Sequence, residues 1–87
     1  MVTIKDECFF SISEACRMLN VEAHTLRYWE KEFQDFVKPL RNAGGNRVYS
    51  NKDIDTLTSI RDLLNVELYT VAGARRQMYL RSCELSA

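Results

Sequence analysis

The sequence predicts a mainly α-helical domain with four helices and one small β-hairpin, and three observations support this prediction. Two short helical patterns, separated by a tight turn, lie at about residues 11–34. A glycine-containing turn between two short extended segments follows at about 36–49. Two more helical patterns follow at about 51–64 and 70–82. This order is typical of a winged helix-turn-helix whose wing is the hairpin, and we expect a single domain over residues 1–87.

Composition limits the function classes that fit the chain. With 87 residues, 46% of them hydrophobic, the chain can form one small core but not a deep catalytic cleft. The 12 basic residues balance the 12 acidic ones, so the formal net charge is zero. A polyanion would therefore have to bind to a local basic face, because the chain as a whole has no strong positive field.

The cysteines Cys8, Cys16 and Cys83 indicate neither a disulfide framework nor a metal site. Their number is odd, no pair has CxxC spacing, and the chain contains a single histidine. We expect Cys16 to be a small buried apolar residue and the two terminal cysteines not to be redox sensors. Since no apolar stretch reaches signal-peptide or membrane-spanning length, we expect a cytoplasmic protein with no membrane contact and no cofactor.

The first helix is predicted to begin after Ser11, because Ser11 and Glu14 form a capping-box pattern. Asn20 is expected to end it, since asparagine tolerates the left-handed conformation of a sharp turn. Arg17 lies on the polar face of this helix. The apolar stripe, spaced i, i+3, i+4 and i+7, consists of Ile12, Ala15, Cys16 and Leu19.

The second helix is predicted over about residues 23–34. Leu26, Trp29 and Phe33 recur at i, i+3 and i+7, and we expect them to face the core beside Val21 from the turn. The opposite or flanking face then carries His24, Arg27, Tyr28 and Lys31.

The hairpin is predicted from the loosely alternating segment 36–41 and the return strand 47–49. Pro39 confines the first segment to an edge strand, because proline cannot donate a ladder hydrogen bond. The turn at residues 42–46 contains two glycines that can adopt positive φ.

The last two helices complete the predicted core. Ser50 and Asp53 repeat the capping-box pattern where the third helix begins, and a fourth helical pattern begins near Thr70. The apolar positions of these two helices are Ile54, Leu57, Ile60, Leu63 and Leu64, followed by Val71, Ala74 and Met78.

The sequence contains no recognisable catalytic motif. There is no Walker loop, GxSxG or HExxH, and the one histidine has no evident nucleophilic partner. Gly44 and Gly45 do not follow a buried strand or open a helix, as a phosphate-binding loop does, so we interpret them as a hairpin turn. We therefore predict no enzymatic activity and no catalytic residue.

The polar face of the second helix instead fits a helix lying in the major groove of double-stranded DNA. Residues near the start of such a helix reach base edges, which fits His24 and Thr25. Arg27, Tyr28 and Lys31 are placed one or two turns further along, where phosphates lie. The simpler alternative is a solvated face on which Glu30 and Glu32 pair with Arg27 and Lys31.

The predicted wing favours the DNA interpretation, because Arg41 and Arg47 flank a flexible glycine turn and would reach the minor groove or its phosphates. The ring of Tyr49 is expected in the core, with its hydroxyl free to touch a phosphate at the edge. The candidate DNA-binding residues are Arg17, His24, Thr25, Arg27, Tyr28, Lys31, Arg41, Asn46, Arg47 and Tyr49.

Four segments between Phe10 and Leu80 resemble the DNA-binding domain of the MerR family of bacterial transcription regulators: ISEACRMLNV, HTLRYWEKEF, AGGNRVYS and YTVAGARR. The resemblance implies that Arg27 and Tyr28 contact the DNA backbone and that Arg47 is the wing arginine that grips phosphate. It also implies dimers on near-palindromic promoter DNA. Many members bend and untwist the promoter spacer so that RNA polymerase can engage both promoter elements.

The chain departs from the family pattern at three points. Glu22 replaces the usual Ser or Thr cap of the recognition helix and brings a carboxylate near DNA, so we expect weak non-specific affinity. Asn20 replaces the usual glycine of the turn. The long dimerisation helix and effector region are not in this sequence, so we expect an N-terminal piece of a longer regulator that forms a homodimer; the alternative is a minimal member that dimerises differently.

Two other functions fit the same pattern. An excisionase-like architectural protein would use a related small winged helix to bend recombination sites, but such a protein more often carries a net positive charge. A protein-interaction module that has kept the fold and lost DNA binding would fit the zero net charge and Glu22.

Overall fold

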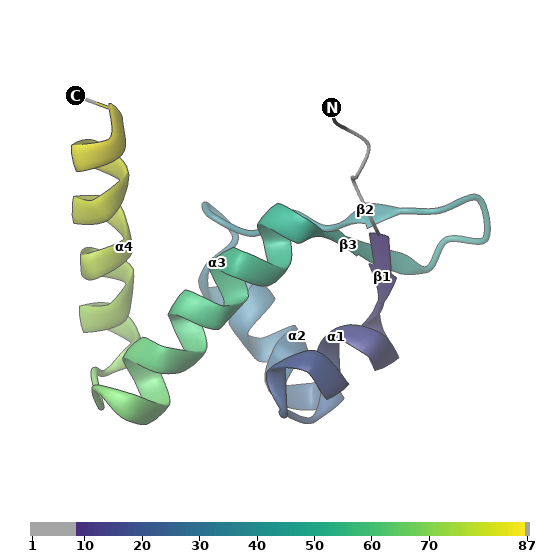
Figure 1. The fold of residues 1–87 in the computed structure, drawn as a ribbon, viewed down its shortest axis with the longest axis horizontal. Helices are drawn as coiled ribbons and strands as arrows, with labels where there is room; N and C mark the ends of the chain where they lie inside the picture. The colour runs from purple at the N-terminus through teal and green to yellow at the C-terminus, as the bar shows by residue number, and fades with distance from the viewer. Residues whose placement is uncertain (1–8, 87) are drawn as a thin grey trace, which may run out of the picture.

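The structure, a computed structural model, describes residues 9–86, and the side chains as far as residue 82. A helix-turn-helix and a small sheet pack on the long helix α3, and α4 stands at the end of the molecule away from the hairpin (Figure 1). In chain order the elements are β1 (Phe9–Ser11), α1 (Ile12–Leu19), α2 (Ala23–Glu32), β2 (Leu40–Arg41), β3 (Arg47–Ser50), α3 (Asn51–Arg61), the π-helical turn η2 (Asp62–Val66) and α4 (Val71–Ser86).

The predicted helix-turn-helix is confirmed together with its capping. The Ser11 hydroxyl accepts from the backbone N–H of Glu14 at 3.2 Å, and the Glu14 carboxylate accepts from the Ser11 N–H at 2.8 Å. Asn20 ends α1 in the left-handed conformation, with φ 59° and ψ 47°. The next helix begins only three residues later, at Ala23, so α1 and α2 are joined by a tight turn.

One hydrophobic core joins α1, α2, β3, α3 and α4. Phe33 and Tyr49 are the largest fully buried side chains, and Trp29 is 4% exposed, so the predicted core position of Trp29 is confirmed. The buried residues of this core are Ala15, Leu19, Leu26, Trp29, Phe33, Val37, Tyr49, Ile54, Leu57, Ile60, Leu63, Ala74 and Met78.

The sheet has three antiparallel strands in the order β1-β3-β2, whereas the sequence predicted only the two strands of the hairpin. The additional strand β1 pairs with β3 along its whole length, from Phe9 opposite Ser50 to Ser11 opposite Val48. The strand β3 of the wing therefore pairs with β2 on one side and with β1 on the other, and β1 leads directly into α1. The start of α1 is held beside the hairpin as a result.

The predicted strand over 36–41 is wrong for most of its length, because β2 contains only Leu40 and Arg41. The backbone N–H groups of Phe36 and Val37 donate to the carbonyl of Phe33 at 2.9 and 3.0 Å. These bonds wind the chain into a turn after α2 and bury Val37. The backbone N–H groups that a longer strand would pair with β3 are therefore already engaged within this turn.

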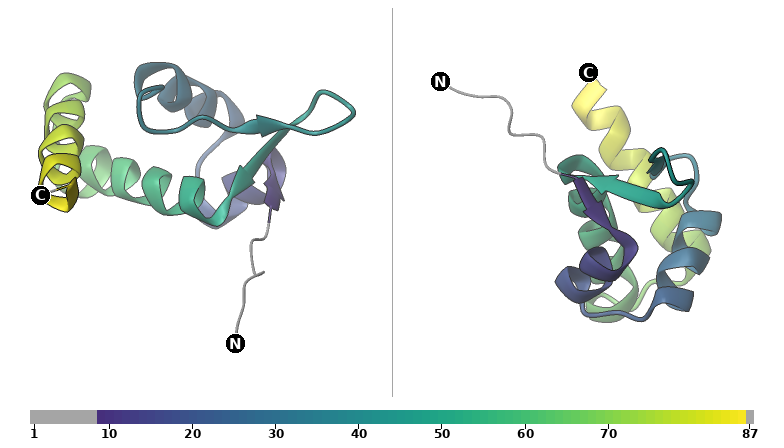
Figure 2. Two further views of the ribbon diagram at one scale, coloured as in Figure 1. Left: turned by 90° about the horizontal axis from the view of Figure 1, so that it is seen from above. Right: turned by 90° about the vertical axis from the view of Figure 1, so that its right-hand side faces the viewer.

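The hairpin turn is organised by one side chain rather than left flexible, as the sequence interpretation had it. The carbonyl oxygen of the Asn42 side chain accepts from the backbone N–H groups of Gly44 at 2.9 Å and Asn46 at 3.1 Å. Gly45 adopts φ 82°, which an L side chain rarely reaches. Figure 2 shows this turn projecting beyond the helices, and the Asn42 bonds fix its shape.

The junction between α3 and α4 differs from a simple loop. The helix α3 begins with the predicted Ser50–Asp53 capping box and continues through η2 to Val66. Leu68 then adopts a positive φ of 62°, and α4 begins beside Thr70, whose hydroxyl accepts from the Gly73 N–H at 3.1 Å. This tight corner turns the chain so that α4 packs back against η2 and the loop after α2.

Among the cysteines, Cys16 is half-buried against the core, and its burial raises the pKa of the thiol. Cys8 and the side chain of Cys83 lie outside the part that the structure describes. Within residues 9–86 no helix is both long enough and apolar enough to cross a membrane.

Candidate nucleic-acid interface

The outer face of α2 carries the polar side chains that the sequence placed there. His24, Arg27, Tyr28 and Lys31 are exposed and follow one stripe at i, i+3, i+4 and i+7, while Thr25 beside them is half-buried. The opposite face of the helix is buried through Leu26 and Trp29, so the packing of the core determines which residues point outward. The result is a helix face with two cations, an imidazole and a phenol.

The ion pairs that the simpler interpretation required do not form. Arg27 and Lys31 have no carboxylate within 4.0 Å among the residues whose side chains are described, and Glu30 lies in the protein interior. An arginine without a protein partner keeps all its donors for a ligand. The pairing of Glu30 with this exposed face, which the simpler alternative assumed, is therefore not present, because Glu30 pairs with Arg47 instead.

No side-chain cap is present at the start of α2 among the residues whose side chains the structure describes. Glu22 occupies the cap position but makes no capping hydrogen bond, and its carboxylate lies 3.5 Å from Nδ1 of His24. Both side chains are more than three-quarters exposed. The first backbone N–H groups of α2, which carry the positive end of the helix dipole, therefore have no side-chain acceptor from Glu22.

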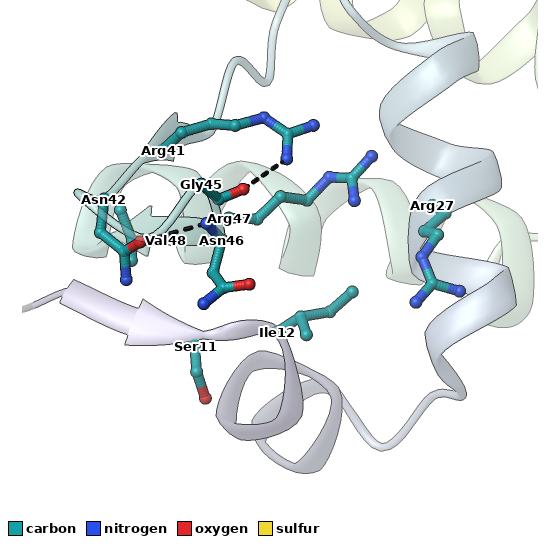
Figure 3. Close-up of a pocket in the computed structure, with 9 residues that line it drawn as sticks. All are labelled: Ser11, Ile12, Arg27, Arg41, Asn42, Gly45, Asn46, Arg47 and Val48. Carbon is teal, nitrogen blue, oxygen red and sulfur yellow. Dashed lines mark hydrogen bonds between the residues drawn. The ribbon is translucent and has the colours of Figure 1, made fainter.

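A hollow of about 320 Å³ lies where the first turn of α1, the helix α2 and the wing meet. Three arginines from three elements line it: Arg27 from α2, Arg41 from β2 and Arg47 from β3. Figure 3 shows the guanidinium groups of Arg41 and Arg47 extending toward the helix that carries Arg27. The other lining residues are Ser11, Ile12, Asn42, Gly45, Asn46 and Val48.

The wing arginines are held in different ways. Arg41 donates one terminal nitrogen to the backbone carbonyl of Gly45 at 2.8 Å, which lays it along the turn. Arg47 donates its Nε to Oε1 of Glu30 at 2.8 Å. Guanidinium groups present a planar fork of donors that matches phosphate, so this hollow is suited to an anionic oxygen cluster.

Tyr49 must be removed from the set of surface candidates. Its side chain is 0% exposed, and its hydroxyl donates to Oε2 of Glu30. The interpretation of the ring as part of the core is confirmed. The expectation that the hydroxyl is free for a phosphate is wrong, because the buried hydroxyl donates its hydrogen bond to the Glu30 carboxylate. Burial, followed by this hydrogen bond, raises the pKa of Tyr49.

The structure does not bring every candidate to the hollow. Arg17 is exposed and lines a second shallow depression beside Asn20 and Glu22, at the turn between the helices. Asn46 does line the main hollow, at the end of the hairpin turn. His24 and Lys31 lie on the outer face of α2 but do not line the hollow, so the candidate interface extends along that helix.

Sequence reasoning missed two residues that shape the site, Glu30 and Asn42. A signal for Glu30 was present, because it lies four residues after Leu26 and three before Phe33, on the same inward stripe. A carboxylate on a buried stripe requires a partner, and the alternating residues Arg47 and Tyr49 of the wing strand could have supplied it.

Comparisons with known proteins agree with this geometry. Residues 10–80 match the family model described as MerR HTH family regulatory protein. The regulator protein TubY of Clostridium botulinum C phage is 31% identical over 71 residues, which are 82% of this chain and 29% of TubY. The HTH-type transcriptional repressor CarA of Myxococcus xanthus is 34% identical over 68 residues, 77% of this chain and 23% of CarA.

The HTH-type transcriptional regulator GlnR of Bacillus anthracis is 30% identical over 78 residues, which are 90% of this chain and 58% of GlnR. The chain thus spans less than two thirds of the length of each of these relatives. The crystal structure of HiNmlR, a MerR family regulator lacking the sensor domain, bound to promoter DNA, shares the fold. Its TM-score is 0.71 at 21% identity, over 92% of this chain and 57% of that one.

These relatives are named as regulators of transcription, and none of the names denotes an enzyme. The family match covers the helix-turn-helix and the wing, the elements that build the arginine-lined hollow, and extends into α4. The chain therefore belongs to the MerR family of helix-turn-helix regulatory proteins, which are DNA-binding regulators of transcription.

Proposed function

We propose that this domain binds promoter DNA with α2 in the major groove and the wing on the flanking backbone or minor groove. The observation that supports the proposal most strongly is the convergence of Arg27, Arg41 and Arg47 on one hollow between helix and wing. Three guanidinium groups in one place form a local cationic surface on a chain whose formal net charge is zero.

The candidate DNA-binding residues of α2 divide by position. His24 and Thr25 lie in its first turn, where a recognition helix reaches base edges. Arg27, Tyr28 and Lys31 follow on the exposed side and are placed for phosphates. Asn46, at the edge of the wing, would add a neutral donor. Arg17 is the outermost candidate, at the turn that precedes α2.

The relatives extend the proposal beyond the domain. Since this chain spans only part of their length, we expect it to be the DNA-binding part of a larger regulator in the bacterial cytoplasm. Such a regulator would bind as a homodimer through a C-terminal helix beyond this chain, and would affect RNA polymerase indirectly by distorting the promoter. A distorted site needs contacts spread over helix and wing, which the arginine-lined hollow could provide.

A salt-dependent titration tests DNA binding. Fluorescence anisotropy should show tighter binding to the promoter DNA flanking the protein's own gene than to a scrambled duplex. The logarithm of the binding constant should fall linearly with the logarithm of the salt concentration. The slope should correspond to several released ions, because each neutralised phosphate contributes about 0.9 to the slope. If neither duplex binds at low salt, the titration is repeated with a covalently linked dimer; absence of binding there as well would contradict the proposal.

A further inference from the structure

Glu30 is a charged residue buried inside the domain, on the inner face of the helix proposed to read DNA. Only 8% of its surface is exposed. A buried carboxylate is strongly unfavourable unless polar partners satisfy its oxygens. The structure supplies those partners from the wing, on the other side of the arginine-lined hollow.

Both oxygens of Glu30 accept hydrogen bonds from β3. Oε1 accepts from Nε of Arg47 at 2.8 Å, and Oε2 accepts from the hydroxyl of Tyr49. Arg47 and Tyr49 are two residues apart, so their side chains leave the same face of the strand. One carboxylate therefore fastens the recognition helix to the wing strand at two neighbouring points.

The contact with Glu30 uses only part of the Arg47 guanidinium. Its Nε is engaged, whereas its two terminal nitrogens make no hydrogen bond with any residue whose side chain the structure describes. The side chain is 31% exposed and lines the hollow beside Arg27 and Arg41. In Figure 3 the guanidinium of Arg47 extends across the hollow toward α2.

A guanidinium held through Nε has its plane fixed, and its two terminal nitrogens, with four N–H donors in that plane, are left for a second acceptor. We infer that Glu30 is a positioning residue, which orients the terminal nitrogens of Arg47 toward a DNA phosphate. The inference rests on the proposed DNA binding and adds a residue that never touches DNA. It makes the buried face of α2 part of the recognition apparatus.

Simple electrostatics leads to the opposite expectation, which makes the inference testable. Removing a negative charge near DNA should strengthen binding if Glu30 acts only through its charge. If Glu30 orients Arg47, the substitution E30Q should weaken binding although it makes the domain more positive. The two expectations differ in sign.

The experiment is a double-mutant cycle on promoter DNA with E30Q, R47A and the double variant, each followed over a salt series. We expect E30Q to weaken binding about fivefold to tenfold and to lower the salt slope by about one ion, as R47A does. The double variant should bind like R47A alone, since the two residues act as one unit. The matched control is E32Q on the same helix, which should not weaken binding.

Three results would overturn the inference: tighter binding by E30Q, an unchanged salt slope, or losses from E30Q and R47A that add. Circular dichroism checks that E30Q is folded. If it is not, R47K replaces it, because an ammonium held by Glu30 keeps the charge but offers no planar pair of donors. R47K should bind as weakly as R47A, and wild-type affinity for R47K would contradict the inference.

The same series separates this inference from the proposed function. If the wild-type domain, including the linked dimer, binds no promoter DNA, the proposed function fails and the inference fails with it. If the wild type binds with the expected salt slope and E30Q leaves that slope unchanged, only the role of Glu30 is wrong.

Discussion

At the scale of single residues, the candidate interface depends on arginine side chains that face outward and keep hydrogen-bond donors free for a ligand. Among the residues whose side chains the structure describes, exposed Arg27 has no carboxylate partner, and Arg47 uses only its Nε in a hydrogen bond. Glu30 and Tyr49 are buried beneath them and form the contact between helix and wing. Outward donors are thus free for an anion, while inward polar groups satisfy one another.

The buried Tyr49 hydroxyl predicts a pH dependence of stability. Tyrosine in an unfolded chain ionises near pH 10, and burial together with the Glu30 hydrogen bond raises the pKa of Tyr49 in the folded domain. The stabilisation that the neutral Tyr49 hydroxyl contributes is complete below pH 10 and is lost as the pH rises toward the folded-state pKa. Above pH 10 the free energy of unfolding should therefore fall by about 1.4 kcal/mol per pH unit, because tyrosine ionises more readily in the unfolded chain.

Urea unfolding of the wild type and Y49F at pH 8 to 11.5 measures this effect. Y49F should be less stable than the wild type at pH 8, and the gap should narrow above pH 10, because only the wild type has this hydroxyl to ionise. Y28F, which removes a half-exposed hydroxyl, serves as the control and should follow the wild type. Parallel curves for the wild type and Y49F across the whole range would contradict the buried contact.

At the scale of elements, the corner between α3 and α4 carries local strain. Leu68 has φ 62°, and its side chain is 77% exposed, so it contributes little burial to offset an unfavourable backbone. The left-handed conformation costs an ordinary residue about 1–2 kcal/mol, and glycine avoids this cost. Beyond the corner, α4 is fixed by Tyr79, which donates to Asp35 at 2.5 Å and packs edge-on against Phe36.

The strain at Leu68 predicts that L68G stabilises the domain. Glycine should raise the free energy of unfolding by about 0.5–1 kcal/mol, after its greater freedom in the unfolded chain is subtracted. The melting temperature should rise by a few degrees for a domain of this size. L80G, within α4, is the opposite control and should lose about 1 kcal/mol or more. A lower melting temperature for L68G would mean that the corner is not strained.

The elements also show which parts of the fold a sequence can predict. The capping boxes of Ser11 and Ser50 were predictable, because each connects residues three positions apart. The strand at Phe9 was not, since its partner is Ser50, far along the chain. Glu30 showed its inward position, but its contacts with Arg47 and Tyr49 depend on how the wing packs on α2, which local spacing does not determine.

At the scale of the whole molecule, the balanced charge is unevenly arranged. Arg27, Arg41 and Arg47 meet on the side of the molecule where α1, α2 and the wing come together. Another depression, next to α3 and α4, is lined by Asp35 and Asp55 as well as by the basic residues Lys52 and Arg81. A zero formal net charge is therefore compatible with a local cationic face, although it predicts weak non-specific attraction to DNA.

The most direct test of this account compares two arginine substitutions in one assay. R27A removes a guanidinium from the hollow, and R76A removes an exposed one from α4, so the net charge changes equally. In the anisotropy titration on promoter DNA, R27A should weaken binding about tenfold and lower the salt slope by about one ion, while R76A should bind nearly as the wild type does. Equal losses from the two substitutions, or none from R27A, would contradict a DNA interface built from α2 and the wing.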